Sequence, residues 1–75
     1  MIGYSQQLVK ANKKANQKLR GVQLGKLCIA KDIPVSALAN RLSVSRTAVY
    51  AWFKGESEIN SVNYALALIV LKKTA

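Results

Sequence analysis

The chain has 75 residues, enough for one small domain that buries only about 60 to 65 % of its unfolded surface, which excludes a large catalytic cleft. Twelve Lys and Arg residues against three Asp and Glu residues give a net charge of +9, and no acid precedes Asp32, so a polyanion such as nucleic acid is the favoured partner. No histidine is present and Cys28 is the only cysteine, which excludes Cys/His zinc sites, disulfides within the chain and Ser/His or Cys/His catalysis.

These exclusions leave a small protein for which we expect no catalytic residue, no metal and no cofactor. The longest apolar run, residues 65–71, is far shorter than the roughly 20 residues that span a bilayer. The N-terminus has no apolar core of the kind that a signal peptide needs, so we expect a soluble chain in a reducing cytoplasm. A basic ribosomal-type or membrane-surface protein is the alternative to a nucleic-acid-binding one.

Helical spacing of apolar residues runs through nearly the whole chain, which predicts an all-α fold. Residues 1–4 are expected to be loose, with Ser5 as an N-cap. The following segment is polar and basic, and its spacing allows either a weakly amphipathic helix or an arm that orders on a partner. We therefore treat residues 1–18 as a basic N-terminal arm or helix extension, in which Lys13 and Lys14 are either solvated or in contact with phosphate.

Residues 19–31 carry the apolar spacing of a core helix, weakened by Gly21 and Gly25. Asp32 and Pro34 interrupt it, because proline cannot donate to the helical hydrogen-bond ladder. A new helix is expected to begin near Pro34. Its buried face is formed by Leu38, Ala39 and Leu42.

A break of three residues, "SVS", precedes a further short helix over residues 46–54. Ser45 is its expected N-cap and Gly55 its stop, while Val44 is expected to plug the core beneath the turn. Val49 and Trp52, three residues apart, share an inward face. Helical rotation then turns four residues outward: Arg46, Thr47, Tyr50 and Ala51.

The last helix, capped by Asn60 or Ser61, is apolar nearly all the way round. One stripe suffices to pack a small domain, and a twin subunit is the simple partner for a second. We assign the core to the stripe of Val62, Ala65, Leu66 and Ile69. The dimer interface is assigned to the other stripe, formed by Tyr64, Leu68 and Leu71.

Two helices joined by so short a turn, in a basic all-α chain, describe a helix-turn-helix. The stretch "LANRLSVSRTAVYAWFKG", residues 38–55, resembles the motif of the phage repressor and Cro-type domains, also called the XRE family. The resemblance extends over about residues 19 to 71. It implies a compact five-helix, lambda-repressor-like domain at residues 19–75 that regulates transcription as a dimer on a palindromic operator. As a Cro-like or short repressor of phage or prophage type, it would act in the cytoplasm of a bacterial host cell, encoded by the host or by a phage.

Two positions depart from the family pattern. The usual glycine of the turn is Ser43 here, which requires a non-glycine residue to adopt a left-handed or strained backbone. The common phosphate-contacting glutamine at the start of the first motif helix is Val35.

The outward residues suit a major groove. Arg46 can donate two hydrogen bonds to guanine, and Thr47 suits a base edge or a thymine methyl. Tyr50 suits a base or a phosphate, and the small Ala51 leaves room for a thymine methyl. Ser45 places the first amides of its helix near a phosphate. The remaining phosphate candidates are Ser36, Asn40, Arg41 and Lys54.

Two other functions stay open on the sequence. An interaction or antitoxin-like module would use the same fold to hold a different protein through the apolar last helix. A nonspecific architectural or RNA-binding protein would bind through the basic N-terminal segment, with an affinity that falls steeply with salt and hardly changes with sequence.

Overall fold

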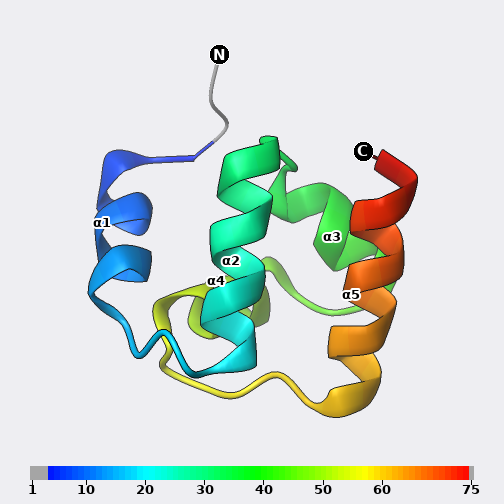
Figure 1. Ribbon diagram of the computed structural model, residues 1–75. Coiled ribbons are helices and arrows are strands. Elements are labelled where there is room, and N and C mark those ends of the chain that lie inside the picture. Colours follow the sequence, from blue (N-terminus) through cyan, green and yellow to red (C-terminus); the bar gives the residue numbers. More distant parts are fainter. Residues whose placement is uncertain (1–3, 75) are drawn as a thin grey trace.

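The computed structural model describes residues 4–74, and within them the chain is all-α, with no strand. None of the helices in this part of the chain is long and apolar enough to cross a membrane. Five helices follow one another (Figure 1): α1 (Gln6–Lys14), α2 (Arg20–Lys31), α3 (Val35–Leu42), α4 (Arg46–Lys54) and α5 (Ser61–Thr74).

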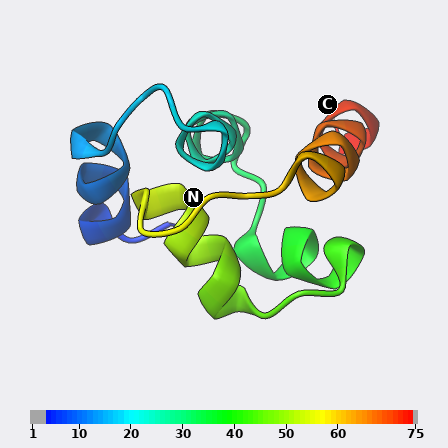
Figure 2. The ribbon, with the colours of Figure 1, turned by 90° about the horizontal axis from the view of Figure 1, so that it is seen from below.

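Helix α2 lies at the centre of the arrangement. It contacts α1, α4 and α5, while α3 packs against α4 and α5. In Figures 1 and 2, α1 and α5 lie at opposite sides of the molecule with α2 and α4 between them. Four of the five helices, α2 to α5, lie within residues 20–74, the part of the chain in which the resemblance led us to expect five. The fifth, α1, lies inside the segment that the sequence left open as arm or helix.

The contact between α2 and α4 depends on two glycines of α2. A Cβ atom on Gly21 would lie 2.8 Å from the Cβ and the carbonyl oxygen of Trp52, and one on Gly25 would lie 2.7 Å from the ring of Phe53. Real Cβ atoms essentially never approach so closely. The two glycines that weaken α2 as a helix are thus the residues that allow α4 to pack directly on it.

Helix α1 is attached to the core by three residues. Leu8 is buried, and Tyr4 is also buried and donates a hydrogen bond from its hydroxyl to the carbonyl of Ile33. The expectation that residues 1–4 are loose is therefore wrong for Tyr4, while residues 1–3 lie outside the described residues. Asn12 is 2 % exposed, and its side-chain amide donates to the carbonyls of Val22 (3.0 Å) and Phe53 (2.8 Å).

Cys28 is a buried structural residue. Its side chain is completely enclosed in the apolar core, and this burial raises the pKa of the thiol to about 12. Because the thiolate is the reactive form of cysteine, the side chain stays an unreactive thiol at neutral pH.

The two stripes of α5 are reversed relative to the prediction. Leu71 is only 4 % exposed and belongs to the core, and Tyr64 and Leu68 pack against it, so the predicted interface of Tyr64, Leu68 and Leu71 is wrong. The exposed stripe consists of Val62 (67 %), Leu66 (44 %) and Ile69 (49 %). Both stripes are apolar, so amphipathicity could not decide between them. The choice follows from the way α5 meets α2 and α3.

Replacing Gly25 by alanine tests the close contact of α2 with α4. In an ordinary helix interior this substitution stabilises by roughly 0.5 to 1 kcal/mol. Here we expect the free energy of unfolding to fall by about 1 to 3 kcal/mol, because the added methyl group overpacks the Phe53 contact. Urea unfolding followed by circular dichroism measures the difference. A variant that is more stable than the parent would show that α2 and α4 are not in such close contact.

Candidate nucleic-acid interface

A turn of three residues, Ser43 to Ser45, joins α3 to α4. Ser43 adopts the left-handed conformation (φ 56°, ψ 44°) that the sequence predicted for a residue in the place of a glycine. This conformation lets the amide of Val44 donate to the carbonyl of Ala39 at 3.1 Å and close the end of α3. The hydroxyl of Ser45 accepts from the amide of Ala48 at 3.1 Å, which confirms Ser45 as the N-cap of α4.

Helix α4 has an inner and an outer face. Val49, Trp52 and Phe53 are buried, which confirms the predicted inward direction of the first two and excludes both aromatic rings as exposed stacking platforms. Val44 is half-buried against the same core. The outer face carries the residues predicted to contact bases: Arg46, Thr47 and Tyr50 are exposed, and Ala51 is half-buried.

The outer face of α4 lies on a projecting edge of the molecule. In Figure 2 the first turn of α4 and the turn before it form the lower edge, with α2 above α4 and α5 away from it. Within the described residues α4 has no contact with α5, and it is flanked by α3 on one side and α1 on the other. The outer face of the first half of α4 is therefore not covered by another described helix.

The predicted phosphate contacts divide between several elements. Asn40 and Arg41 are exposed on α3, Ser36 there is half-buried, and Ser45 is exposed at the start of α4. Lys54, at the end of α4, is 3.6 Å from the carboxylate of Glu56, in a pair that is open to solvent. Lys13 and Lys14 are exposed in the last turn of α1, beyond the part of that helix nearest Tyr50.

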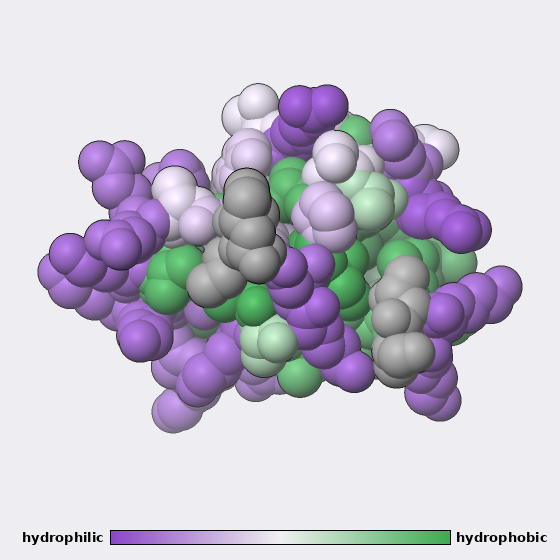
Figure 3. Space-filling model, turned by 90° about the horizontal axis from the view of Figure 1, so that it is seen from above, coloured by the Kyte–Doolittle hydropathy of each residue, from purple (hydrophilic) through white to green (hydrophobic). Residues whose placement is uncertain are grey.

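Positive charge by itself does not mark one face. Each of the five helices carries at least one exposed Lys or Arg side chain, and in the view from above hydrophilic side chains project around the whole rim, with hydrophobic surface between them (Figure 3). The shape and composition of the α4 edge therefore distinguish the candidate interface more clearly than charge does.

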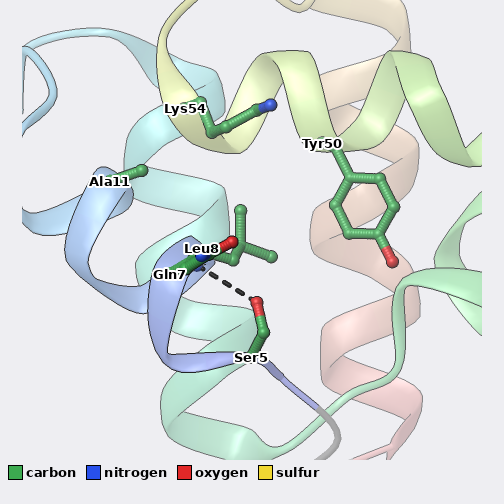
Figure 4. A pocket seen from close by; sticks show the side chains of 6 residues that line it. All are labelled: Ser5, Gln7, Leu8, Ala11, Tyr50 and Lys54. Carbon is green, nitrogen blue, oxygen red and sulfur yellow. Dashed lines mark hydrogen bonds between the residues drawn. The ribbon is translucent and has the colours of Figure 1, made fainter.

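Two polar residues beside α4 were not predicted as contact residues. Ser5, the cap of α1, and Gln7 within α1 line a hollow together with Tyr50 and Lys54 of α4 (Figure 4). Ser5 was predicted as an N-cap, and its hydroxyl does accept from the amide of Leu8 at 3.2 Å. Its place beside α4 has no signal in the sequence, because it depends on how α1 packs across the fold.

Comparisons with known proteins leave the family of the chain open. No family model, no curated protein and no solved structure matches it. The resemblance of residues 38–55 to a repressor motif remains a prediction, and the geometry of α3, the turn and α4 carries the functional inference.

Two serines of the turn give opposite predictions for stability. Ser43→Gly should raise the free energy of unfolding by about 0.5 to 1 kcal/mol, because glycine adopts the left-handed conformation without steric cost. Ser45→Ala should lower it by about 1 kcal/mol, because the amide of Ala48 loses its acceptor. Denaturant unfolding of both variants checks the pair, and a change of the same sign in both would contradict the observed turn geometry.

Proposed function

We propose that this chain is a sequence-specific, duplex-DNA-binding transcriptional regulator in which α3, the turn and α4 act as a helix-turn-helix. The observation that carries the proposal is the outer face of α4. Three exposed side chains with hydrogen-bonding groups, Arg46, Thr47 and Tyr50, lie on a projecting helix whose other face is anchored by buried residues. An α-helix of this kind fits the major groove of B-DNA, which is about 12 Å wide.

The side chains divide between base reading and positioning. Arg46 has the two parallel donors that match O6 and N7 of guanine, and such a pair contributes about 1 to 3 kcal/mol of discrimination against the wrong base. Thr47 and the small Ala51 allow contact with a base edge or a thymine methyl. Asn40 and Arg41 of α3, with Ser45 at the turn, are placed to hold the DNA backbone, which sets the register of α4 in the groove.

A homodimer is the form in which we expect the protein to act. Val62, Leu66 and Ile69 present an apolar stripe on α5, and α5 lies away from α4, so a second copy bound there leaves α4 uncovered. Two α4 helices would then read half-sites about 34 Å apart, and repression would come from occupying a promoter.

The same apolar stripe favours a second candidate, a protein-interaction module on the same fold. In that case α5 would bind a different protein, and binding would neither require DNA nor change on Arg46→Ala. Transcriptional regulation is preferred because the stripe alone does not account for the polar outer face of α4.

Selection of bound sequences from a random duplex pool is the primary test of DNA reading. We expect an enriched palindrome, and we expect Arg46→Ala to weaken binding to it by about 1 to 3 kcal/mol and to relax the preference at one base pair in each half-site. Arg20→Ala is the matched control, because it removes the same charge from α2, where Arg20 lies over the ring of Tyr64. A pool without an enriched sequence, or equal effects of the two substitutions, would refute sequence-specific reading.

Leu66→Lys tests the dimer. The exposed position tolerates lysine, so we expect a folded monomer by analytical ultracentrifugation and circular dichroism. Operator affinity should fall by tenfold or more, although the added positive charge alone would raise affinity for DNA. A variant that remains dimeric would show that the exposed stripe of α5 is not the interface.

A further inference from the structure

A hollow of about 350 Å³ lies between α1 and α4, beside the outer face of α4 (Figure 4). Tyr50 and Lys54, one turn apart on α4, border it on one side. The N-cap Ser5 and three residues of α1 border it on the other side: Gln7, Leu8 and Ala11. The hollow thus joins the proposed DNA-reading helix to an element that lies outside the helix-turn-helix.

The position of α1 beside α4 is built into the core. The amide of Asn12 donates to a carbonyl of α2 and to the carbonyl of Phe53 in α4, and Leu8 is buried between these elements. Gly25 leaves the room that the Asn12 amide occupies, because a Cβ there would lie 2.8 Å from its nitrogen. The face of α1 toward α4 is therefore held in place before any partner binds.

The two lysines at the end of α1 lie on different faces. Gln7, Ala11 and Lys14 are spaced by four and three residues, which places them along one side of a helix, and the first two of them line the hollow. Lys13 lines a separate hollow on the other side of α1, with Tyr4, Gln6, Val9 and Lys10. Neighbours in the sequence thus face different surroundings.

The chemistry of the hollow suits an extended polyanion. Its polar lining residues are Ser5, Gln7, Tyr50 and Lys54. Only Lys54 among them carries a charge, and helical spacing puts the exposed Lys14 on the same side of α1 as Gln7. No acid occurs before Asp32 in the chain. The acid that is paired with Lys54, Glu56, is exposed, so a phosphate can replace it without leaving a buried charge.

We propose that α1 is a second flank of the DNA-binding surface, which holds the sugar-phosphate strand on the Tyr50–Lys54 side of the major groove. This inference rests on the proposed reading of DNA by α4. In Figure 2, α1 is set back from the lower edge formed by the start of α4, so α4 enters the groove first and α1 meets the strand at its border. Lys54, Gln7 and Lys14 contact phosphates along that strand, while α3 holds the opposite strand.

Two matched pairs of substitutions test the flank: Lys14→Ala against Lys13→Ala, and Gln7→Ala against Gln6→Ala. All four residues are exposed, and circular dichroism and urea unfolding check that each variant keeps the parental fold. We expect Lys14→Ala and Gln7→Ala to weaken binding by roughly three- to tenfold at 0.1 M salt, for the selected operator and for a scrambled duplex alike. Lys14→Ala should also reduce the slope of log K against log [salt] by about 0.9, as expected for the loss of one phosphate contact. Lys13→Ala and Gln6→Ala should leave affinity and slope near the parental values.

The failure of the flank is distinguishable from the failure of DNA reading. If Lys14→Ala and Lys13→Ala have the same effect, or if Gln7→Ala binds like the parent, α1 is not a flank, while an enriched operator and its dependence on Arg46 would still support reading by α4. If the unaltered protein enriches no sequence and binds no duplex, both proposals fall together.

Discussion

Helices α2 and α4 are in direct contact, and this contact sets the positions of the elements around them. Gly21 and Gly25 let Trp52 and Phe53 pack against the backbone of α2 without an intervening side chain. This contact determines which face of α4 is buried, and so which face is presented at the edge of the molecule. A small chain has few residues for its core. Direct packing of α4 on α2 needs few core side chains to fix which way the outer face of α4 points.

Helix α1 depends on the same contact. Its Asn12 reaches one carbonyl of α2 and one of α4, at the place where the two helices meet over Gly25. If α2 and α4 moved apart, the buried Asn12 amide would lose one of its two acceptors, which costs free energy. The packing of α1 thus depends on the observed arrangement of α2 and α4. The polar and basic segment at the start of the chain is thereby part of the packed structure from Tyr4 onward and lies beside the outer face of α4.

In helix α5 the periodicity of apolar residues could not predict which stripe is buried. The helix is apolar on both stripes, and the assignment of Val62, Leu66 and Ile69 to the core was reversed in the structure, where Leu71 is buried instead. When a helix has one polar face, that face is exposed to water and the rotation of the helix about its axis is fixed. When a helix is apolar all round, only its contacts with neighbouring helices fix this rotation. The exposed stripe is consequently a property of the packed fold.

The helical character of the chain, the caps at Ser5 and Ser45 and the two faces of α4 could be predicted from the sequence, because each depends on spacing or on hydrogen bonds between residues close in the chain. Two local features were predicted only as alternatives: the structure selects Asn60 rather than Ser61 as the cap of α5, and the left-handed rather than another strained backbone at Ser43. Packing between distant parts of the chain makes Gly21 and Gly25 contact points, lets Asn12 join three helices, exposes one stripe of α5 and turns Gln7 and Ala11 toward α4. Each of these depends on residues far apart in sequence that meet through packing, and local propensity carries no information about which partners they meet.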